Sequence, residues 1–332
     1  ENISYLYFPI AGEAGLKSSL TPNLGGDAKI DQNTFLLEPV SAENLVNNRN
    51  SRNFWCNVKG IGSWSLTGNA AEALSKKFTE MQDDSEVTAG FMWQKTTRES
   101  KKYQLRGEIL SFIPVEKNVE VMLVTITNTG RMAQTVTPTA AIPLYGRSAD
   151  NIRDHRHVTS LLHRIETTDT GVLVTPTLSF DERGHQVNHM TYYCVGWSGN
   201  GEKPVDFYPT AEDFVGEGGN FERPYAIVKK AEGVKAGTRI EGLEAVGGLH
   251  FSEVTLEPEE ECSYLIFTGI TEDIQEIRNL SKTYTTREMV LEELEKTKAY
   301  WQEKVNVAYH TGDSDFNQFM HWVSFQPILR RI

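Results

Sequence analysis

Apolar and polar residues alternate with a period of two over most of the chain between Glu86 and Phe267. Successive side chains of a β-strand point to opposite faces, so this alternation predicts strands. Turn residues separate the runs, which are KYQLRGEILSFIP (102–114), VEVMLVTITN (119–128), AQTVTPTAAIPLY (133–145), HRHVTSLLHRIE (155–166), VLVTPTLSF (172–180), VNHMTYYCVGW (187–197), HFSEVTL (250–256) and CSYLIFTGI (262–270). Strand follows strand without a helix between them, which predicts a mainly β fold of large antiparallel sheets packed as a sandwich.

Two segments depart from this alternation. Residues 70–81 are spaced for a short helix with one apolar face, formed by Ala70, Ala73, Leu74, Phe78 and Met81. Residues 199–224 are rich in glycine and proline and are expected to form one long loop. Loops of this length in a compact domain often carry function.

The period changes to that of a helix after Thr271. The segments 272–284 and 286–305 are charged and free of glycine and proline, which predicts two helices, the second with a face of Met289, Leu291, Leu294, Lys298 and Trp301. A third helix follows Thr311 or Asp313, either of which can cap it, and its apolar stripe of Phe316, Phe319, Met320 and Val323 needs a partner. We therefore expect a sandwich domain over 1–270, a helical linker over 271–310, and over 311–332 the start of a helical domain that continues in a longer protein.

The charge and cysteine content narrow the function classes. The net charge is -12 and the pI about 5.2, which argues against nucleic acid as a partner because its phosphates require a basic surface. No apolar run approaches the roughly 20 residues of a membrane helix, so we expect no membrane partner. The three cysteines, Cys56, Cys194 and Cys262, are far apart and odd in number, which argues against a disulfide framework and for a reducing, cytoplasmic location.

One stretch, GRSADNIRDHRHVTSLLHR (146–164), concentrates arginine, histidine and aspartate in this acidic chain. On a strand His155 and His157 would share a face and form a possible half-site, with His163 farther along that face. No third ligand stands at matching spacing, so we expect no metal site. Serine hydrolase chemistry is not indicated either, since GWSG at Gly196 lacks the second glycine of a GxSxG elbow. The chain also contains no glycine-rich nucleotide loop of the usual spacing.

A sugar site remains compatible with the composition. Sugars offer apolar C–H faces and dense hydroxyls, which aromatic rings and carboxylates, amides and arginines recognise together. Such mixtures occur in RNFW (52–55), GSWSLTG (62–68) and DFYPTAEDF (206–214), although each of these aromatic residues could equally belong to the core. A catalytic pair of carboxylates cannot be chosen among 45 acidic residues from the sequence alone.

Several motifs in the same order resemble a known family. YFPIAGEAGLKSSLTPNLGGD (7–27), SRNFW with GSWS, VEVMLVTITNTG, DFVGEGG (213–219) and TGDSDFNQFMHWVSFQPILRRI (311–332) resemble the N-terminal part of glycoside hydrolase family 94. These are inverting β-glucan phosphorylases, once grouped as glycosyltransferase family 36. The opening block, RNFW and YGRSADNIRDHRHVTSLLHR (145–164) are most similar to the 1,2-β-oligoglucan phosphorylase branch.

The resemblance implies a fold and an activity. The fold is a galactose-mutarotase-like supersandwich, a helical linker and an (α/α)6 barrel, of which residues 311–332 would be the first helix. The reaction converts a β-glucan and phosphate into α-glucose 1-phosphate and a shorter glucan, with inorganic phosphate as co-substrate and no cofactor. The catalytic acid lies in the barrel in this family, so we assign no catalytic residue here and expect this chain alone to be inactive. The implied partners are a β-glucan oligosaccharide, the protein's own C-terminal barrel and a second copy in a homodimer.

The resemblance also suggests a role for the cationic stretch. We predict that Arg147, Asp150, Arg153, His155 and Arg156 lie where a loop meets a strand and form the glucan-binding edge of the cleft. The alternative is a structural salt-bridge network that holds the sandwich to its barrel. The later part, His157 to Arg164, is expected to be strand, with Arg156, Val158, Leu162 and Arg164 on the face opposite the histidines.

Three other functions stay open on the sequence. The chain could be a stand-alone carbohydrate-binding sandwich. It could belong to a cellobiose or other β-glucoside phosphorylase of the same family. It could also be a sandwich enzyme such as an aldose epimerase, for which His155 or His157 would be the histidine to consider.

Overall fold

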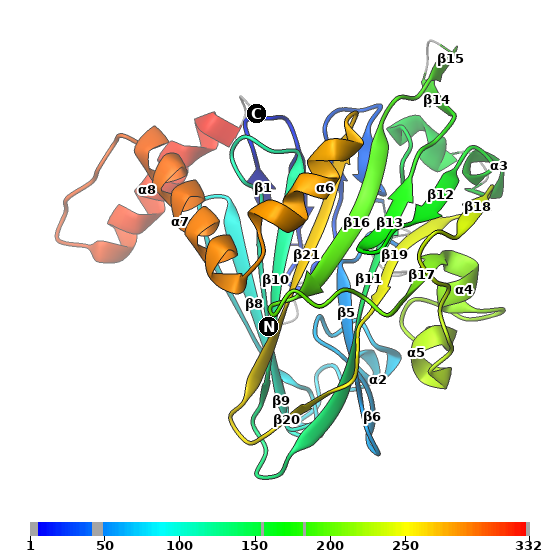
Figure 1. Cartoon of the computed structure of the whole chain (residues 1–332). Helices are drawn as coiled ribbons and strands as arrows, with labels where there is room; N and C mark the ends of the chain where they lie inside the picture. The colour runs from blue at the N-terminus through cyan, green and yellow to red at the C-terminus, as the bar shows by residue number, and fades with distance from the viewer. Residues whose placement is uncertain (1–5, 42–48, 154–155, 182–183, 330–332) are drawn as a thin grey trace.

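Two large antiparallel sheets face each other in the computed structural model, which describes residues 6–41, 49–153, 156–181 and 184–329 (Figure 1). Among these residues, nine strands form the first sheet, in the order β18 (Arg239–Glu241), β12 (Arg164–Thr167), β13 (Gly171–Val174), β16 (Thr191–Ser198), β21 (Glu261–Thr271), β10 (Val119–Asn128), β9 (Leu105–Phe112), β8 (Trp93–Ser100) and β7 (Asp84–Gly90). The second sheet has the order β17 (Asp206–Thr210), β19 (Ala245–His250), β11 (Gln134–Leu144), β5 (Asn53–Val58) and β6 (Gly62–Ser65), with β20 (Val254–Leu256) also paired to β11.

Two smaller sheets complete the β structure of the described residues. Near the N-terminus, β1 (Phe8–Ala11), β2 (Lys17–Leu20), β3 (Ala28–Lys29) and β4 (Phe35–Leu37) form a four-stranded sheet. A hairpin of β14 (Leu178–Asp181) and β15 (Gly184–Val187) projects from the large sheet. The three cysteines are free thiols.

Strand β10 shows why this chain folds as a sandwich. Met122, Val124 and Ile126 point into the main core, which the two large sheets share. Val121 and Leu123 point to the opposite face, where they pack against helices. All ten residues of β10 are buried, which explains why VEVMLVTITN is almost continuously apolar, because both of its faces are covered.

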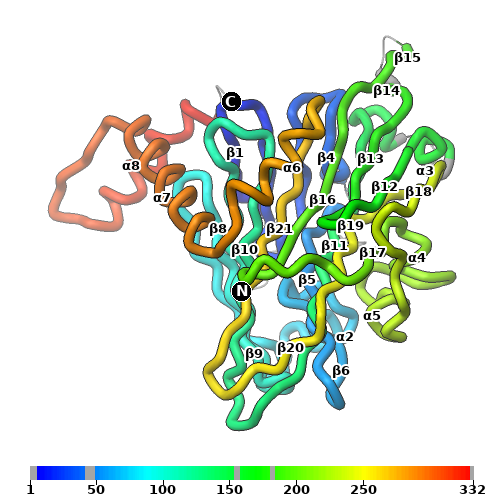
Figure 2. The backbone as a smooth tube through the Cα atoms, viewed as in Figure 1, coloured from blue at the N-terminus to red at the C-terminus, as the bar shows by residue number. Residues whose placement is uncertain are grey.

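Three helices follow the last strand. Helices α6 (Ile274–Thr283) and α7 (Arg287–Lys304) cover the outer face of the nine-stranded sheet, as Figure 2 shows along the orange part of the tube. Helix α8 (Ser314–Leu329) begins after Asp313, whose carboxylate accepts hydrogen bonds from the backbone N–H groups of Asp315 and Phe316, as the capping pattern predicts. Phe325 of α8 stacks on Phe91 at 4.4 Å between ring centroids.

The helix expected over residues 70–81 is much shorter than predicted. Helix α2 covers Ala71–Ser75 only, and Phe78 then adopts a left-handed backbone conformation with φ of 66°. Phe78 and Met81 are 85% and 69% exposed, so these apolar side chains do not pack against the rest of the protein and do not stabilise a longer helix. A helix of this length is marginal without packing. Local hydrogen bonds, such as the one from the Phe78 N–H to Gln82 Oε1, pair the backbone groups of this segment instead.

The long loop expected over residues 199–224 is also wrong. It contains strand β17 and helix α4 (Ala211–Val215), followed by helix α5 (Tyr225–Lys229). Both helices cover the outer face of the six-stranded sheet, on the opposite side of the molecule from α6 and α7 (Figure 1). Pro209 lies in β17 where the register shifts between Tyr208 and Thr210. A proline is tolerated there because β17 is an edge strand. The glycine and proline content of residues 199–224 therefore predicted a loop where a short strand forms.

The strand expected over residues 155–166 starts much later. A 3-10 helix η1 (Ala149–Arg153) and helix α3 (Arg156–Ser160) precede β12, which begins only at Arg164. Val158 and Leu161 are exposed, so the alternation of HRHVTSLL does not bury a strand face. Residues 158–163 therefore do not alternate between two strand faces, and the division of this part of the stretch by strand parity is wrong. The side chains of residues 155–157 lie outside the described residues.

Candidate functional site

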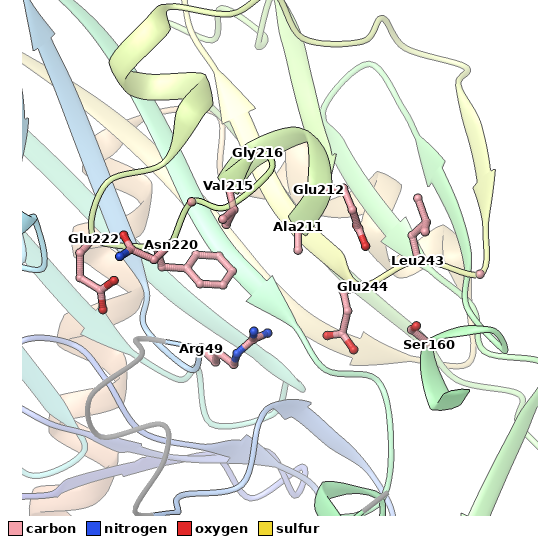
Figure 3. Close-up of a pocket in the computed structure, with 13 residues that line it drawn as sticks. Arg49, Ser160, Ala211, Glu212, Val215, Gly216, Asn220, Glu222, Leu243 and Glu244 are labelled. Atoms are coloured by element: carbon pink, nitrogen blue, oxygen red, sulfur yellow. The ribbon is translucent and has the colours of Figure 1, made fainter. Parts of the chain in front are cut away.

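A pocket of about 590 Å³ opens beside helix α4, and we call it the α4 pocket. Its polar lining residues are Arg49, Ser160, Glu212, Asn220, Glu222 and Glu244. Its other lining residues are Ala211, Val215, Phe221 and Leu243, with glycines at 216, 219 and 242. Figure 3 shows Arg49, Asn220 and Glu222 on one side of the pocket and Glu212, Glu244 and Ser160 on the other.

Helix α4 and the turn after it form one wall. Thr210 caps the helix, since its hydroxyl accepts from the Asp213 N–H at 3.1 Å and donates to the Asp213 carboxylate at 2.7 Å. The helix ends at Gly216, where φ is 76°. A Cβ atom on Gly219 would lie 2.2 Å from the carbonyl oxygen of Val215, so the chain can fold back against α4 only with a glycine there. The glycine cluster GEGG therefore shapes the rim of the pocket.

The opposite wall depends on Glu244. Its backbone carbonyl accepts a hydrogen bond of 2.8 Å from the Ala211 N–H, which fixes it against the start of α4. Its carboxylate Oε1 is 2.8 Å from Nη2 of Arg147, and the two side chains are 19% and 3% exposed. A buried arginine thus holds a carboxylate that reaches the pocket surface.

Arg147 is held in turn by a network behind the pocket. Its Nη1 donates to the Thr159 hydroxyl at 2.9 Å and its Nε donates to Nε2 of His163 at 3.3 Å. The guanidinium lies 4.9 Å from the centre of the Tyr145 ring. The network therefore connects the end of β11, helix α3 and the segment that carries Glu244.

His163 is fully buried, and burial together with the nearby Arg147 cation lowers its pKa to about 3. The imidazole is therefore neutral near pH 7. Because Nε2 accepts from Arg147, the ring proton is on Nδ1, which donates to the carbonyl of Leu243 at 3.2 Å. His163 acts as a neutral structural link between Arg147 and the pocket wall.

The residues predicted to bind glucan fall into three groups. Arg147 is 4% exposed and does not line the α4 pocket, and its contacts with Thr159, His163 and Glu244 form a polar network within the sandwich. A network that holds the sandwich to a barrel stays a prediction. Asp150 is partly exposed on η1 and does not line the pocket either. Arg153 ends η1 and Arg156 begins α3, but their side chains, like the whole of His155, lie outside the described residues. Glucan binding by these five residues stays a prediction.

Sequence reasoning missed most of the pocket. Glu212 lies in DFYPTAEDF and Gly216 in DFVGEGG, two segments that the sequence marks as sugar-like or glycine-rich. Nothing in the sequence around Glu244 distinguishes it from other glutamates. It reaches the pocket because β19, which follows it directly, pairs with β17, which precedes α4.

The aromatic mixtures singled out in the sequence belong to the core. Phe54, Trp55, Trp64, Phe207 and Tyr208 are buried residues of the six-stranded sheet, and Phe214 is buried in helix α4 beside it. Phe221 is the aromatic residue that lines the α4 pocket, and its ring packs 6.2 Å from that of Phe214. The pocket therefore has one aromatic face supported by core aromatics.

Metal ligands and membrane-spanning helices are two further features to consider in the part of the chain that the structure describes. Within it, no group of three histidine, cysteine or acidic residues is placed to hold a metal ion. No described helix is long and apolar enough to cross a membrane. A histidine–carboxylate pair does occur, between His250 and Asp206 at 2.7 Å, but neither residue lines the α4 pocket.

The facing sheets, the flanking helices and the pocket define a β-supersandwich with a polar, partly aromatic surface site. The glycosyl hydrolase 94 supersandwich domain matches residues 39–287, and the chain belongs to this family. It is therefore a domain of a carbohydrate-active enzyme. A comparison with curated proteins gives no match.

Solved structures show more distant similarity. A bacterial glucoamylase complexed with acarbose has 9% identity and a TM-score of 0.48, over 87% of this chain and 35% of its own. A putative kojibiose phosphorylase from the human microbiome has 9% identity and a TM-score of 0.43, over 96% and 38%. A putative aldose 1-epimerase from Escherichia coli K12 has 9% identity and a TM-score of 0.41, over 80% and 99%. The chain thus spans about a third of the glucoamylase that it matches.

Proposed function

We propose that this chain is the non-catalytic, sugar-binding domain of an inverting β-glucan phosphorylase and that the α4 pocket binds the glucan. The observation that carries the proposal is the make-up of this pocket in a chain of the glycosyl hydrolase 94 family, where Phe221 offers an apolar face beside three glutamates. Sugars are recognised by this combination, because their C–H faces stack on rings and their hydroxyls donate to carboxylates.

The proposed reaction of the whole enzyme is phosphorolysis. Phosphate takes the place of the water of an inverting glycosidase and attacks the anomeric carbon, while a carboxylic acid protonates the leaving oxygen. The products are α-glucose 1-phosphate and a shorter glucan. We assign neither the acid nor the phosphate ligands to this chain, whose role in the proposal is to bind and orient the glucan.

The exposed apolar residues of α8 support a proposal about what this helix contacts. Phe316, Phe319 and Val323 are exposed on one helix, and a contiguous apolar surface usually marks an interface. We propose that the helical barrel of the same protein covers it and that the enzyme is a homodimer.

The free thiols support a cytoplasmic location, because oxidising compartments favour disulfides.

Two measurements on the purified chain test the proposal. Isothermal titration with sophorose, laminaribiose and cellobiose should detect binding, and Phe221→Ala should weaken it by about two- to tenfold, since aromatic contacts are worth roughly 0.5–1.5 kcal/mol. Phe78→Ala, at an exposed ring that does not line the pocket, is the matched control. Phosphate release from glucose 1-phosphate, with glucose or sophorose as acceptor, should be undetectable. Turnover by this chain would contradict the non-catalytic role.

A stand-alone carbohydrate-binding domain is the second candidate. It is favoured by one observation, that segments far apart in this chain, from Arg49 to Glu244, together line one pocket. Binding of all three disaccharides with similar affinity would support it, whereas a preference for one linkage would favour a phosphorylase and identify its substrate. Preference for cellobiose would indicate a cellobiose phosphorylase of the same family.

A further inference from the structure

We infer that Glu244 is the carboxylate of the α4 pocket that accepts hydrogen bonds from sugar hydroxyls, and that the buried Arg147 is the positioning residue that orients it. The inference rests on the proposed glucan-binding role of the pocket. It changes the role of Arg147 from a residue that touches the sugar to one that acts through Glu244.

The position of Glu244 supports the first half of the inference. Glu244 lines both the α4 pocket and a small adjoining recess, and Arg49, Ala211 and Phe221 also line both. In Figure 3 its carboxylate lies at the centre of the site, with Arg49 on one side of it and Ser160 on the other. The other acidic residue on that side, Glu212, is exposed in the first turn of α4. A carboxylate that is already ordered loses little conformational entropy when it binds a ligand.

The surroundings of Arg147 support the second half. Each nitrogen of its guanidinium has a partner: Nη2 contacts Glu244, Nη1 contacts Thr159 and Nε contacts His163. The group is buried and does not line the pocket, so it cannot touch the ligand directly. Arginine presents a planar fork of donors in fixed directions, which a lysine ammonium cannot reproduce. Arg147 can therefore influence binding only through the residues that it holds.

Glu244 is also fixed through its backbone. His163 donates from Nδ1 to the Leu243 carbonyl and accepts, through its own carbonyl, the Gly242 N–H at 3.0 Å. The Ala211 N–H holds the Glu244 carbonyl from the other side. Residues 242–244 are therefore held between α4 and the segment around His163, and the Arg147 contact restricts the Glu244 side chain further.

The test is sophorose binding by calorimetry together with thermal unfolding for a small set of variants. Glu244→Gln should raise the Kd by about tenfold or more, since a hydrogen bond to a charged group contributes about 1.5–3 kcal/mol. Arg147→Lys should raise the Kd by a similar factor. In the Glu244→Gln background Arg147→Lys should change the Kd no further, because its effect passes through Glu244. Arg239→Lys, in an exposed pair with Glu166, is the matched control and should leave the Kd unchanged.

The outcomes separate the inference from the proposed function. If the Kd losses of Arg147→Lys and Glu244→Gln add fully in the double variant, Arg147 acts by general stability and the positioning role is overturned. If Phe221→Ala weakens binding while Glu244→Gln does not, the inference is overturned and the proposed function stands. Absence of sophorose, laminaribiose and cellobiose binding by the native chain overturns both. Should Arg147→Lys not fold, Thr159→Val removes one guanidinium contact and should raise the Kd about two- to threefold only while Glu244 is present.

Discussion

Arg52 and Glu120 form a buried ion pair that joins the two large sheets, with Nη2 and Oε2 3.0 Å apart. Arg52 directly precedes β5 of the six-stranded sheet, and Glu120 is the second residue of β10 in the nine-stranded sheet. The same groups reach the N-terminal sheet, because Arg52 donates to the Gly26 carbonyl and Ser18 donates to Glu120. Three sheets therefore meet at one pair of charges.

We predict that Glu120→Gln destabilises the chain by about 3–5 kcal/mol, because it leaves the Arg52 cation buried without its counter-charge. Urea unfolding followed by circular dichroism gives the free energy. The matched control is Glu108→Gln, which breaks the more exposed pair with Lys95 at 3.2 Å and should cost less than about 1 kcal/mol. Equal losses for the two variants would show that burial does not make the Arg52–Glu120 pair important.

The Arg52–Glu120 pair also shows where sequence reasoning ends. The short apolar run VEVMLVTITN, bounded by turn residues, predicts β10 correctly because the signal is local. Nothing local shows that Arg52, in a segment with sugar-site composition, faces a glutamate 68 residues away. That contact depends on how the sheets pack, which the sequence pattern does not contain.

Helix α3 shows the same limit of prediction from local sequence at the candidate site. The sequence HRHVTSLLHRIE alternates like a strand, yet its first part folds as a helical turn with Val158 and Leu161 exposed. Long-range bonds from Arg147 to Thr159 and His163 hold this turn, and they override the weak local pattern. Sequence reasoning located the region of chemical interest, but it could not distinguish the buried Arg147 from the pocket-lining Glu244.

The buried imidazole of His163 predicts a pH dependence. Its pKa is about 3 in the folded chain, against about 6.5 for an ordinary histidine. Between these values the unfolded chain binds a proton that the folded chain does not, so the unfolding free energy falls as the pH is lowered from about 6.5. The slope from this one group is at most about 1.4 kcal/mol per pH unit. Urea unfolding at several values between pH 7.5 and 5 measures it.

The variant His163→Gln separates this effect from the titration of carboxylates. Glutamine can accept from Arg147 but does not titrate, so the variant should be less stable at pH 7.5 and should lose less stability between pH 6.5 and 5. His189→Gln, at an exposed histidine, should keep the dependence of the native chain. If His163→Gln and the native chain show the same slope, the imidazole is not the origin of the effect.

Gly171 tests how tightly β13 packs beside β16. A Cβ atom there would lie 2.1 Å from the carbonyl oxygen of Cys194 and 2.6 Å from the Cα of Val195. Both atoms are backbone, so the strands must shift, and we predict that Gly171→Ala costs about 1–3 kcal/mol. Gly312→Ala is the control, because nothing lies within 4 Å of its Cβ position, and it should change the stability by less than about 0.5 kcal/mol. A neutral Gly171→Ala would show that these two strands can separate at little cost.

Trp301 connects helix α7 to helix α8. Its side chain is fully buried, and its ring meets that of Phe325 edge-on at 6.2 Å between centroids. Removing so large a buried side chain costs about 3–5 kcal/mol, so Trp301→Ala should loosen α8 before it disturbs the sandwich. Hydrogen exchange should therefore speed up across Ser314–Leu329 while the amides of β10 stay protected. Phe319→Ala, at a ring 61% exposed on the same helix, should leave both rates unchanged. Uniformly faster exchange in α8 and β10 would mean that the helices and the sandwich unfold as one cooperative unit.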